Sequence, residues 1–155
     1  MTRASDLVLL DTNILVHLIR NSSVGQRLML DHSLDSRPER PLIARATVGE
    51  IRALGLKLGW GAPKLRHLDD LLHELVIVEP AQGDITERYA EIDHYCEKVV
   101  KPARPIGQND LWIAATAASA GAQLITTDSD FDHLAGQFIR LLKVDPNTGA
   151  TQVLE

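Results

Sequence analysis

The chain has 155 residues, which is enough for a buried core, and we expect residues 1–155 to form a single domain. Its single cysteine, Cys96, excludes an intrachain disulfide, and no apolar run approaches the roughly 20 residues that span a bilayer. We therefore expect a cytoplasmic protein without a membrane segment. The net charge of −5 does not by itself favour nucleic-acid binding, but the distribution of charge matters more than its sum.

The first half of the chain predicts alternating strands and helices. An apolar run at 7–10 predicts a strand, and apolar residues at helical spacing predict helices at 14–19 and 24–30. A polar loop with two prolines follows at 31–41, and the run at 41–44 predicts the second strand. Helices are expected at 47–58 and 65–75, separated by Gly59, Gly61 and Pro63.

The second half continues the same alternation. The run at 75–80 predicts the third strand, stopped by Pro80, and an amphipathic helix is expected at 85–99. Asn109 is expected to cap a helix that ends near Ala120. Strands are predicted at 123–127 and 138–144, with a short terminal strand after the turn at 145–149. This order predicts an α/β fold, a three-layer α/β/α sandwich around a parallel sheet of four to five strands.

Four carboxylates stand out from this arrangement. Asp11 and Asp128 each follow a predicted strand, Asp110 lies at the start of a predicted helix, and Glu50 lies within one. Taken singly, each has an ordinary role as a cap, a partner of a helix dipole or a solvated acid near Lys57. Right-handed crossovers place strand-to-helix turns on one sheet edge, so Asp11, Asp110 and Asp128 are expected to converge there.

Converging carboxylates predict a divalent-metal site, because they repel one another unless a cation lies between them. Mg²⁺, or Mn²⁺, is the expected ion, since hard cations prefer carboxylate oxygens and water. Such a site favours a metal-dependent phosphodiesterase that uses an activated water. The sequence has no metal-binding histidine or cysteine spacing, no glycine-rich nucleotide loop and no G-x-S-x-G segment, which argues against zinc, nucleotide and serine-hydrolase chemistry.

Charge is unevenly distributed along the chain. Residues 20–66 contain nine Lys and Arg against four Asp and Glu, whereas residues 67–97 contain one Arg against nine acids. Lys98, Lys101 and Arg104 then form a short basic stretch without an acid. Two interpretations remain open, an ordinary solvated helix surface and a basic rim for phosphates beside an acidic pocket.

The segments "LLDTNILV", "NDLWIAATAASAG" and "LITTDSDFDHL", with a glutamate in a central helix, resemble those of PIN-domain ribonucleases, and among them the VapC toxins of toxin–antitoxin pairs. The resemblance extends from about residue 7 to 144. It implies that the catalytic acids are Asp11, Glu50, Asp110 and Asp128. Of these, Asp11, Asp110 and Asp128 are the expected metal ligands, with Glu50 and Asp130 as further candidates. We prefer Asp128 to Asp130 because it directly follows the strand, and we expect Asp130 to cap the segment leading into Phe131.

The resemblance also implies supporting residues and an activity. Thr12 or Thr127 would hydrogen-bond a metal-bound water, and Asn13 would hold the turn after the first strand. The implied reaction is Mg²⁺- or Mn²⁺-dependent endonucleolytic hydrolysis of RNA, possible substrates including tRNA, which leaves a 5′-phosphate and a 3′-hydroxyl. From their positions in the basic half we name four candidate RNA-binding residues, Arg45, Arg52, Lys57 and Lys64.

The implied partners are a second copy of the chain, in a homodimer, and a cognate VapB-like antitoxin whose C-terminal segment crosses the acidic pocket. The helical region 47–75, with an exposed Trp60, is a candidate surface for either partner, although core packing is the simpler role for each leucine there. Two other functions are kept as alternatives. One is a catalytically silent PIN-like module that binds RNA or a protein, and the other is an Mg²⁺-binding receiver-type or phosphatase-like domain.

Overall fold

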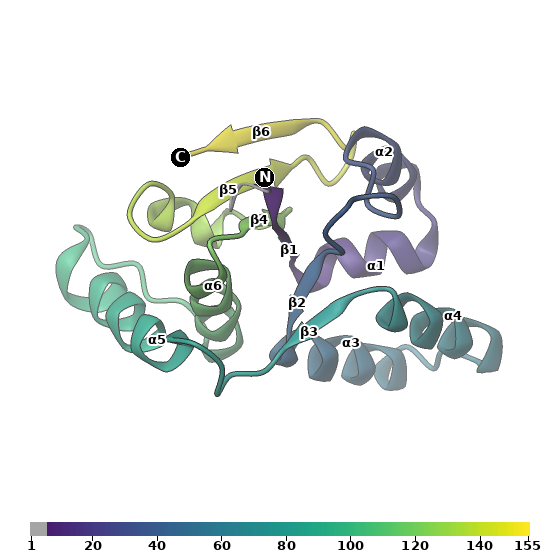
Figure 1. The fold of residues 1–155 in the computed structure, drawn as a ribbon, viewed down its shortest axis with the longest axis horizontal. Coiled ribbons are helices and arrows are strands. Elements are labelled where there is room, and N and C mark those ends of the chain that lie inside the picture. Colours follow the sequence, from purple (N-terminus) through teal and green to yellow (C-terminus); the bar gives the residue numbers. More distant parts are fainter. Residues whose placement is uncertain (1–5) are drawn as a thin grey trace.

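The computed structural model describes residues 6–155 and contains one six-stranded sheet with helices on both faces (Figure 1). The strand order is β3-β2-β1-β4-β5-β6. The strands are β1 (Val8–Leu10), β2 (Leu42–Ala44), β3 (Val76–Val78), β4 (Gln123–Thr126), β5 (Arg140–Val144) and β6 (Thr151–Leu154). The first five run parallel, and β6 pairs antiparallel with β5. The predicted α/β sandwich with a parallel sheet is confirmed, and β6 adds an antiparallel edge strand.

Two apolar clusters separate the helices into two layers. One cluster joins the sheet to α1 (Thr12–Arg20), α2 (Ser23–Asp31), α3 (Arg45–Lys57) and α4 (Ala62–His73). The other joins it to α5 (Ile85–His94), the π-helical turn η2 (Tyr95–Val99), α6 (Gln108–Ala120) and the 3₁₀ helix η3 (Ser129–Leu134). In β1, Val8 and Leu10 belong to the first cluster and Leu9 to the second, because successive strand side chains point to opposite faces.

The sheet has a topological switch point between β1 and β4. The chain adds β2 and β3 on one side of β1, then crosses over to place β4 and β5 on the other side. Ligands of open α/β sheets bind in the crevice outside the carboxyl ends of the strands at such a point. The residues that follow β1 and β4 therefore flank the expected binding position. The order also excludes a receiver-type domain, whose sheet has the order 2-1-3-4-5.

Two local predictions were wrong. Helix α6 begins at Gln108, and its N-cap is Gly107, which makes no side-chain capping bond, so Asn109 is not the cap. Trp60 is half-buried rather than exposed, because it packs against the first apolar cluster and its ring covers Gly55 of α3. Within the described residues, no helix combines the length and the apolar character needed to cross a membrane.

Candidate metal centre

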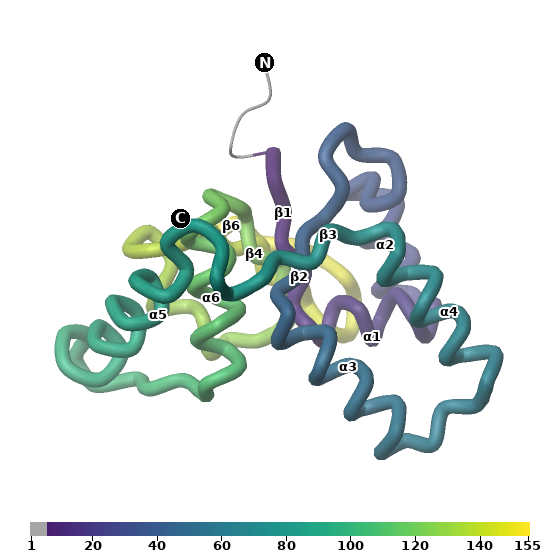
Figure 2. Tube along the Cα trace, turned by 60° about the horizontal axis from the view of Figure 1, so that its bottom comes forward, coloured from purple at the N-terminus to yellow at the C-terminus, as the bar shows by residue number. Residues whose placement is uncertain are grey.

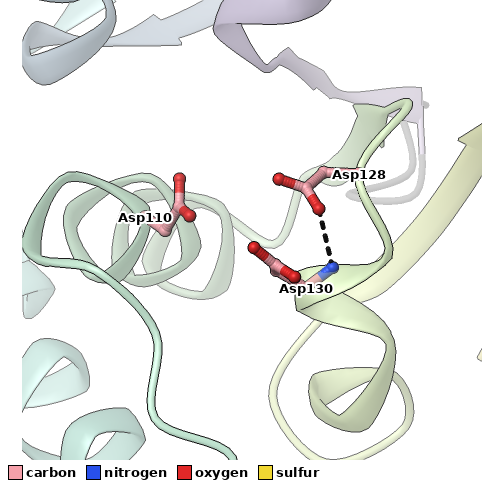
Figure 3. Close-up of side chains that lie close together, drawn as sticks. All are labelled: Asp110, Asp128 and Asp130. Carbon is pink, nitrogen blue, oxygen red and sulfur yellow. Dashed lines mark hydrogen bonds between the residues drawn. The ribbon is translucent and has the colours of Figure 1, made fainter.

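Three aspartates form a compact group at the switch point (Figure 3). Asp110 lies in the first turn of α6, Asp128 directly follows β4, and Asp130 lies in η3. One carboxylate oxygen from each lies within 4.8 Å of the corresponding oxygens of the other two. Three hard oxygen donors at this spacing fit a divalent cation such as Mg²⁺, and an acidic cluster of this kind is otherwise strongly repulsive.

The turn after β4 positions two of these carboxylates. The Asp128 carboxylate accepts a hydrogen bond of 2.9 Å from the backbone N–H of Asp130, and Asp128 is the N-cap of η3. The expectation that Asp130 provides this cap was therefore wrong. The cap bond fixes the start of η3 beside Asp128. Figure 3 shows the Asp130 carboxylate next to Asp128 and facing Asp110.

Asp11 directly follows β1, and three donors hold its side chain. Its side chain is only 4% exposed and accepts hydrogen bonds from Thr126 Oγ1 at 2.7 Å, the Thr12 N–H at 2.8 Å and Asn13 Nδ2 at 3.1 Å. Burial raises the pKa of Asp11, the bonds from Thr126 and Thr12 oppose that rise, and the charges of Glu50 and Asp128 add to it. Three hydrogen bonds thus hold the Asp11 carboxyl in a fixed orientation at the end of β1.

Glu50 reaches the same region from α3. Its Oε1 accepts a hydrogen bond of 2.7 Å from the Thr12 hydroxyl, which also lies 3.3 Å from the buried Thr47 hydroxyl. The Thr12 side chain therefore joins the start of α1 to α3. Sequence periodicity could not have shown this contact, because it depends on how α1 and α3 pack.

The five acids share one electrostatic environment. The pKa of Asp110 is raised to about 7, first by burial and then by the charges of Asp11, Asp128, Glu50 and Asp130, in that order. No described residue donates a hydrogen bond to its side chain to offset this. Asp11 and Glu50 thus act on the three-aspartate group through charge, although neither belongs to it.

Thr126 is a functional candidate that the sequence interpretation missed. Its fully buried hydroxyl donates to Asp11 and accepts a hydrogen bond of 3.0 Å from the Asp128 N–H, so it links the ends of β1 and β4. Thr127, the expected supporting residue, contributes its N–H to Asn13 Oδ1 at 3.2 Å, while its hydroxyl makes no hydrogen bond to any described residue. The sequence signal that could have identified Thr126 is a hydroxyl side chain at the last position of a buried strand.

The four candidate RNA-binding residues differ in their surroundings. Arg45 forms a bidentate ion pair with Glu79, and Arg52 pairs with Asp69 at 3.2 Å. The Lys64 ammonium lies 5.2 Å from the centre of the Trp60 ring. Lys57 lines a groove of about 570 Å³ that also contacts Thr12, Glu50 and Asn109. Of the four, Lys57 thus borders a groove that also contains Glu50.

The sequence matches the PIN domain family over residues 8–137, which is most of the chain. The chain belongs to the PIN domain family. This PIN domain is 30% identical over 124 residues to Ribonuclease VapC1 of Haemophilus influenzae strain R2866, a match that covers 77% of this chain and 85% of the relative. The resemblance to VapC proteins is therefore confirmed.

Solved structures of VapBC assemblies contain chains with the same fold. The PIN domain is similar to a chain of VapBC-1 from nontypeable Haemophilus influenzae, with a TM-score of 0.66, 25% identity and coverage of 88% of this chain and 97% of that one. VapBC-5 from Mycobacterium tuberculosis gives a TM-score of 0.62 and 25% identity, with coverage of 90% and 99%. VapBC2 from Rickettsia felis, at 23% identity, gives a TM-score of 0.70 and covers 87% and 96%.

Proposed function

We propose that this PIN domain is a metal-dependent endoribonuclease and the toxin of a toxin–antitoxin pair. The observation that supports this most directly is the group of Asp110, Asp128 and Asp130, with Asp11 and Glu50 close enough to raise the pKa of Asp110. A relative named as a ribonuclease supports RNA as the substrate class. The proposed reaction is hydrolysis of a phosphodiester bond to a 5′-phosphate and a 3′-hydroxyl.

The residues divide into two roles in this proposal. Asp110, Asp128 and Asp130 would hold Mg²⁺ or Mn²⁺, with Asp11 and Glu50 contributing to the negative field. A bound cation would lower the pKa of a coordinated water and neutralise charge on the phosphate. Thr126, Asn13 and Thr12 keep the Asp11 and Glu50 carboxylates oriented through their hydrogen bonds. No nucleophilic side chain is required, because water is the nucleophile.

The proposed partners follow from the family and the charge of the site. Solved relatives are described as VapBC toxin–antitoxin complexes, which supports a VapB-like antitoxin for this chain. An arginine of that antitoxin would bind the aspartates bidentately and replace the charge of the cation. A homodimer and a tRNA substrate remain proposals that rest on the family alone, and so does a cytoplasmic location.

The decisive assay compares RNA cleavage by the wild type and by Asp110→Asn. This substitution keeps the shape of the side chain and breaks no hydrogen bond, since none is made by the Asp110 carboxylate to a described residue. We expect Mg²⁺-dependent cleavage by the wild type, abolished by EDTA, and a loss on the order of 100-fold or more in the variant. Equal cleavage by both proteins would contradict the proposed site.

A second measurement separates a nuclease from a silent binding module. Isothermal titration with Mg²⁺ or Mn²⁺, without RNA, should show binding to the wild type that is strongly weakened in Asp128→Asn. A wild type that binds RNA but neither binds the cation nor cleaves would instead support the silent PIN-like module. Sequencing of 5′ ends after expression in cells would then identify the RNA target of an active enzyme.

A further inference from the structure

The end of η2 and the segment that leads from it toward α6 contain exposed cations without an assigned role in the proposed reaction. We define residues 98–104 as the basic turn, whose charged residues are Lys98, Lys101 and Arg104. All three side chains are exposed, and the next acid after Glu97 is Asp110. Figure 2 shows the chain leaving α5 and returning to the start of α6 through this region.

The basic turn is attached to the three-aspartate group at two points. The Arg104 guanidinium donates to the Ser129 carbonyl at 3.5 Å, and Ser129 lies between Asp128 and Asp130. The same chain then enters α6, where Asp110 lies six residues after Arg104. The turn is also folded onto η2, since the Arg104 N–H donates to the Cys96 carbonyl at 2.8 Å. Its position beside the acids is therefore set by these two hydrogen bonds and by the chain that continues into α6.

Among residues 6–155, ion pairs with acids occupy some cations and leave others, including those of the basic turn, without an acidic partner. Arg27, Arg45, Arg52, Arg88 and Lys143 all form ion pairs with acids. Within residues 6–155, no acid forms an ion pair with any cation of the basic turn. A paired arginine must give up its acidic partner before it can bind a phosphate, whereas a cation without an acidic partner has no ion pair to break.

We infer that the basic turn binds the backbone phosphates of single-stranded RNA next to the bond that is cut. An acidic centre repels a polyanion at every phosphate that a metal does not neutralise, so cations beside the centre are needed to hold the flanking strand. Phosphate contacts position a strand without reading its bases. The inference rests on the proposed ribonuclease function. It assigns the main RNA contacts to the basic turn rather than to Arg45 and Arg52.

The test measures RNA binding as a function of salt. Asp110→Asn serves as the background, so that a fluorescent single-stranded RNA is bound and not cut. The test variant adds Lys98→Gln, Lys101→Gln and Arg104→Gln. The charge-matched control adds Arg45→Gln, Arg52→Gln and Arg88→Gln, which remove three cations that are held in ion pairs.

Counterion release predicts the size of the effect. Each phosphate contact to a single strand contributes about −0.7 to the slope of log K against log salt, so loss of three contacts should reduce its magnitude by about 2. The same arithmetic gives an affinity loss of about 100-fold at 0.1 M salt. We expect this loss for RNAs of unrelated sequence, little change in the control, and an unchanged unfolding midpoint in the test variant.

The outcomes distinguish this inference from the proposed function. If wild-type protein cleaves RNA but the slope is the same with and without the basic-turn cations, the inference is overturned and the ribonuclease stands. A reduced slope in the charge-matched control alone would overturn it too, in favour of Arg45 and Arg52. If the wild type neither binds nor cleaves RNA, both the inference and the proposed function fail.

Discussion

At the scale of single residues, Asp110 is the most sensitive member of the acidic cluster. Asp11 and Asp128 have hydrogen-bond partners that stabilise or orient them, whereas the Asp110 carboxylate has none among the described residues. Its negative charge is thus opposed by burial and by four neighbouring acids. A carboxylate in such a position is well suited to a cation, which removes the source of its instability.

The raised pKa of Asp110 predicts a pH dependence of stability in the metal-free protein. Its pKa is about 7 in the folded state against 3.8 as the ordinary value, so between these values the folded protein binds more protons than the unfolded one. The free energy of unfolding should therefore fall as pH rises from about 4 to 7 and level off above. Urea denaturation in EDTA measures this, and Asp110→Asn should flatten the curve. An equally steep curve in the variant would assign the effect to other groups.

Thr126 permits a second test at the residue scale. Thr126→Val keeps the shape of the side chain but removes the donor to Asp11 and the acceptor for the Asp128 N–H. We expect a loss of about 1–3 kcal/mol in the free energy of unfolding and weaker Mg²⁺ binding, because the two strand ends lose their link. Thr127→Val is the matched control and should change stability by less than about 0.5 kcal/mol. Similar losses in both variants would contradict the assigned role of Thr126.

At the scale of secondary-structure elements, close packing of α1 against α2 shapes one end of the molecule. A Cβ added at Gly25 would lie 2.4 Å from the His17 carbonyl oxygen, which is backbone and cannot rotate away. In α3, by contrast, a Cβ added at the exposed Gly49 would meet no atom within 4 Å. Close packing thus requires a glycine at Gly25 of α2, whereas the space around Gly49 of α3 would accept a side chain.

These two glycines predict opposite effects on stability. Gly25→Ala should destabilise the protein by about 1–3 kcal/mol or more, because α1 and α2 must separate. Gly49→Ala should stabilise it by about 0.5–1 kcal/mol, because alanine loses less backbone entropy in a helix. Urea midpoints of the two purified variants measure both effects. A neutral Gly25→Ala would show that the α1–α2 contact adjusts at low cost.

At the scale of the whole molecule, the site is assembled by the sheet topology. The acids come from the end of β1, from α3, from α6 and from the turn after β4 with η3, and of these elements only α6, β4 and η3 follow one another in sequence. The strand order brings them to one edge. Cation binding should therefore stabilise the native arrangement as a unit.

Mg²⁺ should raise the stability of the entire fold, since the unfolded chain does not bring the acids together. At a free concentration of 100 times Kd, the free energy of unfolding should rise by about 2.7 kcal/mol. The increase at a fixed Mg²⁺ concentration should be larger at pH 8 than at pH 6, because the cation must displace the proton on Asp110. Differential scanning fluorimetry at constant ionic strength, with Na⁺ as the control, measures both. No Mg²⁺-specific shift at either pH would contradict a metal centre here.

Much of the fold could be predicted from the sequence, because the relevant signals are local. Alternating apolar runs and helical periodicities located the strands and helices, and parallel strands necessarily direct Asp11 and Asp128 to the same edge. Helix starts were predicted less well, as at Asn109, since the cap depends on the backbone geometry of Gly107 rather than on a side chain. The family resemblance, confirmed by the comparisons, supplied Glu50.

The sequence by itself determined the order of elements, the parallel sheet and the edge at which acids gather, because these follow from local hydrophobic patterns and chain chirality. Only the tertiary structure decided that Asp130 joins Asp110 and Asp128, that Thr126 rather than Thr127 links the strand ends, and that Arg45 and Arg52 are already paired with acids. Each of these depends on side chains from distant segments meeting at hydrogen-bond distance. Such contacts are set by packing angles and turn geometry, which no local pattern encodes.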